Sequence, residues 1–165
     1  MIPLADVQGE VLGGVQRLAH STLPIRDAVG LVTAADVVAA EAVPPFANTA
    51  MDGYAVRAAD TDGAGPEDPV RLEVAGELPA GQAPAQPVEE GEAIRIMTGA
   101  PMPDGADAVV MVEYTERDGD AVRVMHAANP GDHVRAAGGD LKPGDLVFAA
   151  GTVLGPAHIG VLASL

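Results

Sequence analysis

The 165-residue sequence contains no cysteine and no tryptophan, and only two tyrosines and two phenylalanines. Without cysteine there are no disulfides, no thiolate nucleophile and no cysteine-ligated metal. Only 9 Lys and Arg oppose 24 Asp and Glu, which gives a formal net charge of −15. So acidic a chain, with so few aromatic rings, lacks the basic surface and the stacking platforms that nucleic-acid binding requires. We therefore expect no nucleic-acid partner.

Long hydrophobic runs are missing as well. No apolar stretch approaches the roughly 20 residues that a bilayer-spanning helix needs. Asp6 and Glu10 interrupt the N-terminal segment, where a secretory signal would have a basic start. The sequence therefore predicts a cytoplasmic protein without a membrane span.

Glycine and proline are abundant instead, with 20 and 14 residues, and they indicate short strands joined by turns. Apolar periodicity predicts helices over 5–20 and 157–165. Alternating or continuous apolar residues predict strands over the ranges 54–56, 70–74, 93–97, 108–116, 121–125 and 146–148. The β-rich middle lies between two partly helical ends. This order predicts a β-rich α+β fold in which residues 44–140 form an inserted domain.

The stretch 44–56, PPFANTAMDGYAV, is the least average part of the chain. Pro44 and Pro45 fix an extended entry, because each proline locks its own φ. Asp52 and Gly53 then form a turn signal immediately before the expected strand. Two interpretations stay open on chemistry alone. Asp52 is either a site carboxylate at the tip of a rigid loop or the side chain of a structural Asx turn.

Other polar residues lie beside glycines in the expected loops, namely Thr98, Asp104 and Asp140, with Arg57, Arg95 and Arg135 near them in sequence. Carboxylates and hydroxyls suit a hard cation such as Mg²⁺, and the planar guanidinium suits phosphate or other oxyanions. The alternative is that the arginines are solvated surface charges and that Thr98 only satisfies its own loop. The four histidines, His20, His126, His133 and His158, have no ligand-like spacing, which argues against a transition-metal site.

Three stretches together carry a resemblance to a known family. They are 44–56, then 94–105 (IRIMTGAPMPDG), then Gly138-Gly139-Asp140. In this order and at these separations they closely resemble the N-terminal part of the molybdopterin molybdenumtransferase family, which includes bacterial MoeA and the E domain of gephyrin. The resemblance covers essentially the whole chain, and most clearly residues 23–165.

The resemblance implies an activity and a set of site residues. Enzymes of this family take adenylylated molybdopterin and molybdate, insert the metal with the help of a divalent cation, and release AMP. By position in the motifs, Asp52 resembles the family's active-site aspartate and would place Mg²⁺ or its water. Thr98 would be its catalytic partner and hydrogen-bond the oxyanions of the ligand. Asp140 matches the aspartate of the third motif, and with the arginines 57, 95 and 135 it is a substrate-binding candidate.

The resemblance also implies an architecture. Residues 1–43 with 141–165 would form an elongated, partial α+β domain related to dimerisation, and residues 44–140 an inserted β-barrel-like or β-sheet domain. Family members are homodimers whose active site lies between the inserted domain of one subunit and the pterin-binding domain of the other. Molybdopterin adenylyltransferase would donate the substrate. We expect the 165 residues to be an N-terminal fragment that supplies half of the site and is inactive alone.

Some positions depart from the family pattern. Ala47 replaces a common acidic residue, Thr49 stands for Ser, and Ala136 replaces a frequent second arginine. A different class of function stays open, that of a gephyrin-like scaffold module that binds partner proteins or receptor tails. The presence of both Asp52 and Thr98 favours the enzyme. On that interpretation Asp52, Thr98 and Asp140 should project from one face of the inserted domain.

Overall fold

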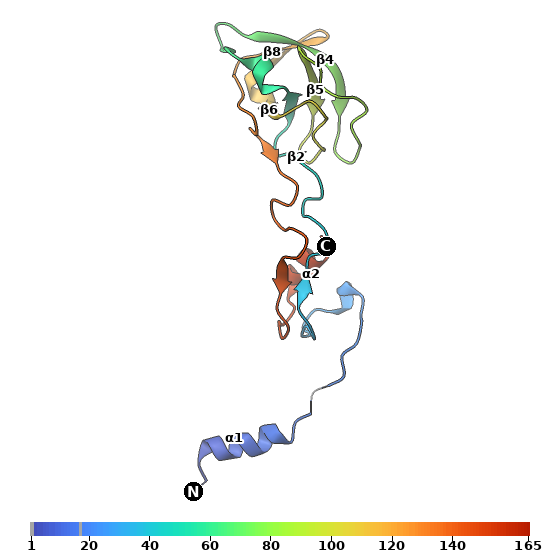
Figure 1. Ribbon diagram of the computed structural model, residues 1–165, viewed down its shortest axis with the longest axis vertical. Helices are drawn as coiled ribbons and strands as arrows, with labels where there is room; N and C mark the ends of the chain where they lie inside the picture. Colours follow the sequence, from blue (N-terminus) through green and yellow to red (C-terminus); the bar gives the residue numbers. More distant parts are fainter. Residues whose placement is uncertain (1, 17) are drawn as a thin grey trace. The chain divides into compact units, whose positions relative to one another are not determined.

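The computed structural model describes residues 2–16 and 18–165, and the chain divides into two compact units (Figure 1). The terminal unit comprises Met1–Val37 and Phe148–Ser164, and the central unit comprises Val38–Val147 with Leu165. In the described residues, strands outnumber helices and a curled six-stranded sheet dominates, so the predicted β-rich α+β class is confirmed. The domain ranges 1–43 with 141–165, and 44–140, stay a prediction. No helix of the described part is long and apolar enough for a membrane crossing.

The terminal unit contains the helical segments of the chain. Helix α1 spans Leu4–Gly13, the 3₁₀ turn η1 spans Ile25–Asp27, and helix α2 spans Pro156–Leu162. The predicted helix over 5–20 is too long, because Gly13 and Gly14 lose more backbone entropy in a helix than other residues do; residue 17 lies outside the described residues. The predicted helix over 157–165 is also shorter in the structure. Pro156 occupies its first turn, where the missing N–H has no cost.

Two pairs of short strands and one 3₁₀ turn build the rest of the scaffold. Strand β1 (Val37–Val38) pairs with β10 (Leu146–Phe148), at the points where the chain passes from one unit to the other. Strand β2 (Asn48–Thr49) pairs antiparallel with β9 (Val134–Arg135) in the central unit. The 3₁₀ turn η2 (Ala58–Thr61) follows strand β3 (Gly53–Val56).

The main sheet of the central unit has six strands in the order β6-β3-β5-β4-β8-β7. Their bounds are β3 Gly53–Val56, β4 Val70–Leu78, β5 Glu92–Ile96, β6 Ala108–Met111, β7 Thr115–Asp118 and β8 Ala121–Val124. All neighbours are antiparallel except β4 and β5, which run parallel. Strand β3 lies between β5 and β6, so both of its edges are hydrogen-bonded. Its N-terminal end leads directly from Asp52.

Two predicted strands have different bounds in the structure. The expected strand 108–116 is interrupted by the 3₁₀ turn η3 (Val112–Tyr114), after which β7 pairs with β8. The interruption begins where the N–H of Val112 bonds to the carbonyl of Asp52, 3.1 Å away. The strand predicted over 70–74 continues to Leu78, because its second half pairs with β5.

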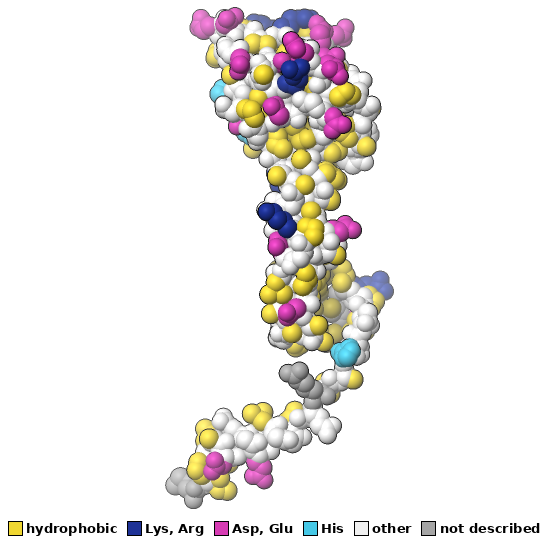
Figure 2. Space-filling view, viewed as in Figure 1, with side chains coloured by type: hydrophobic (Ala, Val, Ile, Leu, Met, Phe, Trp, Pro, Cys, Tyr) yellow, Lys and Arg dark blue, Asp and Glu magenta, His cyan; other side chains and the backbone are white. Residues whose placement is uncertain are grey.

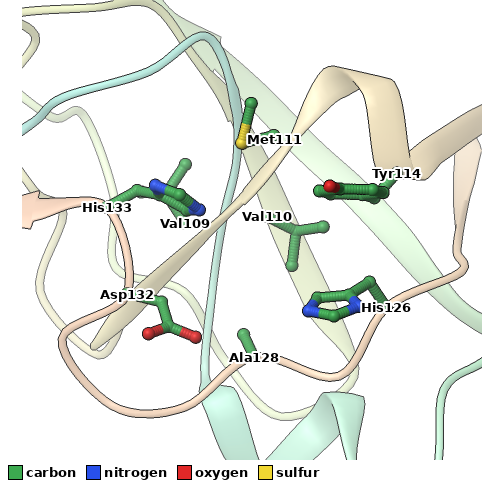
Figure 3. Close-up of a pocket in the computed structure, with 8 residues that line it drawn as sticks. All are labelled: Val109, Val110, Met111, Tyr114, His126, Ala128, Asp132 and His133. Carbon is green, nitrogen blue, oxygen red and sulfur yellow. The ribbon is translucent and has the colours of Figure 1, made fainter.

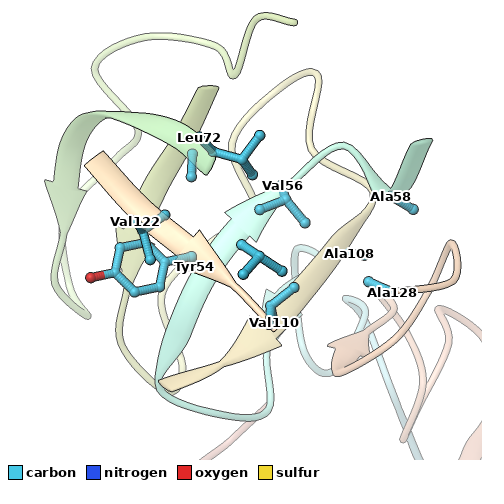
Figure 4. Packing of buried hydrophobic residues seen from close by; sticks show 10 residues of the cluster. Tyr54, Val56, Ala58, Leu72, Ala108, Val110, Val122 and Ala128 are labelled. Atoms are coloured by element: carbon cyan, nitrogen blue, oxygen red, sulfur yellow. The ribbon is translucent and has the colours of Figure 1, made fainter. Parts of the chain in front are cut away.

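Side chains on the two faces of the sheet form two separate apolar clusters. Tyr54 and Val56 of β3 point into one cluster with Val110, Leu72 and Val122 (Figure 4). Ala55 points into the other cluster, which includes Ile94, Ile96, Leu78, Val88 and Val109. The alternation follows from the two-residue period of a strand. Because both faces of β3 are buried, the register of this strand is well determined. Ile94 and Ile96 of the neighbouring strand β5 are buried as well.

Gly53 is required by the close approach of β6 to β3. A Cβ atom at position 53 would lie 2.0 Å from the carbonyl oxygen of Val110. We expect Gly53→Ala to destabilise the central unit by about 1–3 kcal/mol or more, since a backbone atom cannot move aside as a side chain can. Urea denaturation of wild type and variant measures this difference.

Gly65→Ala is the matched control. A Cβ atom there meets nothing within 4 Å, so the replacement should be neutral or slightly stabilising. Equal midpoints for Gly53→Ala and Gly65→Ala would contradict the packing described here.

Candidate functional site

The antiparallel pairing of β3 with β5 brings Asp52 and Thr98 together. Gly53 lies opposite Ile96, so the residue before β3 meets the segment that follows β5. The Oδ1 atom of Asp52 accepts two hydrogen bonds, one from the Thr98 N–H at 2.7 Å and one from the Thr98 hydroxyl at 2.8 Å. Both side chains are exposed. The two predicted catalytic residues therefore form one polar pair at the surface of the central unit.

The environment of Asp52 favours its ionised form. The Thr98 N–H is the main reason why the pKa of Asp52 lies below its ordinary value, and the Thr98 hydroxyl and the charge of Arg95 add to this effect. Both bonds from Thr98 end on Oδ1. Within the described part of the chain, Oδ2 accepts no hydrogen bond, so it is available to a ligand.

Backbone hydrogen bonds fix the two loops that carry this pair. Thr49 exchanges two bonds with the second loop, donating to the Ala100 carbonyl (3.0 Å) and accepting from the Gly99 N–H (2.9 Å). The Met102 N–H donates to the Ala47 carbonyl at 2.9 Å. On the other edge of this stretch, β2 pairs with β9. The motif 44–56 is therefore held between the 98–102 loop and the 134–135 strand.

The third motif joins the same stretch further back. The N–H groups of Gly138 and Asp140 donate to the carbonyls of Pro44 and Val43, each at 2.9 Å. The carboxylate of Asp140 forms an ion pair with Arg135, with 3.0 Å between Nη2 and Oδ2. Both side chains are more than half exposed, and such pairs contribute about 0–1 kcal/mol. The structure brings Asp140 to Arg135; the projection of Asp140 on one face with Asp52 and Thr98 stays a prediction.

The two other predicted arginines lie in different places. Arg95, on β5, has its guanidinium carbon 6.0 Å from the centre of the Tyr54 ring and its Nε 3.9 Å from a Glu77 carboxylate oxygen. Arg57 follows the far end of β3, about 13 Å from Gly53 at 3.3 Å per residue. There it lies 3.7 Å from both Asp60 and Glu90. Arg95 is therefore the arginine beside Asp52, and Arg57 is remote from it.

The described residues contain no group of three or more His, Cys, Asp or Glu arranged to hold a metal ion. Asp52 can supply a single carboxylate oxygen. That agrees with the chemistry of Mg²⁺, which usually keeps several waters and takes one or two carboxylates together with substrate phosphates. In the loop after Thr98, the Asp104 carbonyl accepts a hydrogen bond from the Val88 N–H at 2.8 Å.

The structure also contains a hollow in the central unit that the sequence did not predict. His126 and His133 line one hollow of about 200 Å³ together with Tyr114 and Asp132 (Figure 3). The Tyr114 and His126 rings are stacked with centroids 5.0 Å apart. The Asn129 N–H lowers the pKa of Asp132, and the two histidines contribute to this shift.

The sequence carries no signal for this hollow, because its residues come from η3, β6 and a separate loop. The Ala50 N–H bonds to the His133 carbonyl at 2.8 Å. This bond ties the hollow's loop to the stretch that carries Asp52. Acidic side chains are scattered over the visible face of the central unit and are not gathered at one place (Figure 2).

Thr98 variants test the cause of the low Asp52 pKa. We expect Thr98→Val to raise the Asp52 pKa part of the way toward 3.8, because the hydroxyl bond is lost and the stronger N–H bond remains. Thr98→Ser should leave it unchanged. Carboxyl ¹³C chemical shifts followed against pH measure this value.

The sign of the stability effect follows from the lowered pKa. The bonds to ionised Asp52 contribute stability above its unfolded-state pKa, and this contribution is lost as the pH falls through the lower folded-state value. A Thr98→Val titration identical to wild type would show that the hydroxyl bond is absent in solution.

Comparison with known proteins supports the family that the three motifs resemble. Residues 2–165 match the family described as "MoeA N-terminal region (domain I and II)". The chain is 48% identical over 144 residues to molybdopterin molybdenumtransferase 2 of Mycobacterium tuberculosis, covering 87% of this chain and 36% of that protein. It is 31% identical over 163 residues to molybdopterin molybdenumtransferase of Staphylococcus aureus, covering 99% and 39%. The chain thus spans less than half the length of these relatives.

Solved structures similar to this chain are also MoeA proteins. The molybdopterin biosynthesis MoeA protein of Pyrococcus horikoshii superposes with a TM-score of 0.83 at 41% identity, covering 87% of this chain and 38% of that one. A second solved structure, also described as a molybdopterin biosynthesis MoeA protein from P. horikoshii, gives a TM-score of 0.85 at 36% identity and covers 99% of this chain and 42% of that one. From motif order, fold and these matches, the chain belongs to the MoeA N-terminal region family.

Proposed function

We propose that the complete polypeptide containing this chain inserts molybdate into adenylylated molybdopterin and releases AMP, and that these 165 residues supply half of the active site. The observation that carries the proposal is the Asp52 carboxylate, ionised by the Thr98 bonds and with its second oxygen available. Its position in the first motif of a family of molybdenumtransferases supports the assignment.

In this proposal Asp52 binds Mg²⁺ through Oδ2, directly or through a water. The cation, when bound, withdraws charge from the phosphate and molybdate oxygens. Thr98 keeps Oδ1 occupied, so that the free oxygen of Asp52 faces outward in one orientation. In the proposed complex the Thr98 hydroxyl would hydrogen-bond a substrate oxyanion in place of Asp52, because its single proton is donated to Asp52 Oδ1 in this structure.

Anionic substrates need local positive charge on so acidic a chain. Arg95 is the first candidate, because it lies beside Asp52. Arg135 and Asp140, joined by their ion pair, form a second substrate contact on the same backbone assembly. Arg57 is the weakest of the proposed substrate contacts, since Asp60 and Glu90 already neutralise it at the far end of β3.

The family assignment extends the proposal to partners. A homodimer would complete the site with the pterin-binding domain of the second subunit, and molybdopterin adenylyltransferase would supply the substrate in the cytoplasm. The gephyrin-like scaffold alternative is not favoured, because the curated relatives are named as transferases.

Asp52→Asn is the direct test of the proposed role. The amide keeps the size of the side chain and can still accept the Thr98 bonds, but it has no charge for a cation. We expect kcat for molybdate insertion to fall by about 100-fold or more, since a metal contact is worth several kcal/mol. The assay uses the complete polypeptide, with Mg²⁺ varied.

Asp62→Asn is the control, because it removes one charge from an exposed carboxylate of the same unit. It should keep wild-type activity. Undiminished insertion by Asp52→Asn would refute the proposed function of this site.

A pair of arginine variants tests the substrate contacts. Arg95→Gln should raise KM for the anionic substrates about tenfold, the value of a lost charged hydrogen bond. Arg57→Gln should change KM less, because Arg57 is remote from Asp52 and paired with carboxylates. A larger effect on KM from Arg57→Gln would contradict this proposal and would indicate that the substrate binds at the other end of β3.

A further inference from the structure

We propose that Thr49 is a positioning residue, whose buried hydroxyl and backbone hold the turn that carries Asp52 in register with the loop that carries Thr98. The consequence for activity rests on the proposed function. The positioning itself does not, and it can be measured on Asp52 alone.

The hydroxyl of Thr49 organises the turn that follows it. The Thr49 side chain is completely buried. Its Oγ1 donates to the Met51 carbonyl at 2.6 Å and accepts from the Met51 N–H at 3.1 Å. Met51 is the residue before Asp52, so the hydroxyl determines the direction in which the chain reaches the carboxylate.

The backbone of Thr49 holds the other loop. Its N–H and carbonyl bond to Ala100 and Gly99, and Gly99 is the residue after Thr98. Gly99 has a φ of +84°, a conformation that few residues other than glycine adopt. The second loop therefore turns at Gly99, within the segment that bonds to Thr49.

These contacts form a closed ring. It runs from Thr49 along the chain to Asp52, across the carboxylate to Thr98, on to Gly99 and back to Thr49. In this ring Thr49 bonds both to the Asp52 turn, through its hydroxyl, and to the Thr98 loop, through its backbone. A change in the hydroxyl would thus alter the orientation of the carboxylate relative to Thr98.

Thr49→Val tests the hydroxyl, because valine keeps the shape of the side chain and makes no hydrogen bond to Met51. Thr49→Ser keeps the hydroxyl and removes only the methyl group. Thr61→Val is the matched control for loss of a buried hydroxyl. Thr61 is also completely buried, donates to the Ala58 carbonyl at 2.7 Å and accepts from the Ala128 N–H at 2.9 Å, beyond the opposite end of β3.

The first measurement is the Asp52 titration by carboxyl ¹³C shifts in the 165-residue chain. We expect Thr49→Val to move the midpoint up toward 3.8, the ordinary value, because the Thr98 bonds to Asp52 lengthen or break. Thr49→Ser should restore the wild-type midpoint. Thr61→Val should lower the denaturation midpoint and leave the Asp52 titration unchanged.

The second measurement is molybdate insertion by the complete polypeptide. Thr49→Val should lower kcat by about 10- to 100-fold, the scale of a small misplacement of a reacting group. KM should change less, and Thr49→Ser should retain nearly full activity.

The result that overturns the proposal is a Thr49→Val variant that loses stability as Thr61→Val does but keeps the wild-type Asp52 titration. If the valine variant does not fold, Thr49→Ala removes the hydroxyl without adding a methyl group and gives the same readout. Failure of the proposed function is distinct: Asp52→Asn would then be active, while the Asp52 titration of the Thr49 variants still decides the positioning role.

Discussion

The pairing of β3 with β5 is the constraint on which the candidate site depends. Strand β3 is buried on both faces and bonded on both edges, so the residue immediately before it has a single position. That residue is Asp52. The end of β5 delivers Thr98 beside it in the same register, and the exposed carboxylate is thereby oriented by a core that it does not touch.

Further backbone hydrogen bonds hold the motif segments close to Asp52 and Thr98. The stretch 43–52 bonds to the 98–102 loop, to β9 and to residues 138–140. None of these bonds requires a particular side chain. The motif residues between them, chiefly glycine, proline, Asn48 and Thr49, are those that such tight turns and buried polar positions need.

The charge of the chain limits how strongly the candidate site can attract an anion. A net charge of −15 opposes molybdate and phosphate. In the described part of the central unit, Arg57, Arg71, Arg95, Arg123 and Arg135 each lie within 4.0 Å of a carboxylate. These ion pairs reduce the positive charge that Arg95 and Arg135 can offer to an anion, so in the proposed function a bound cation would have to supplement it.

The sequence by itself determined the β-rich class, the strands that alternate with period two, and the identity of the motif residues. Continuous apolar runs and weak helices were less well predicted, as for 108–116 and 5–20, since periodicity does not show where a tertiary contact or a glycine ends an element. Only the tertiary structure decided which polar residues meet. Asp52 and Thr98 are 46 residues apart, Arg57 is closer in sequence yet remote in space, and His126 and His133 line the same hollow. The register between β3 and β5, a property of the packed sheet, determines that Asp52 meets Thr98 and that Arg57 does not.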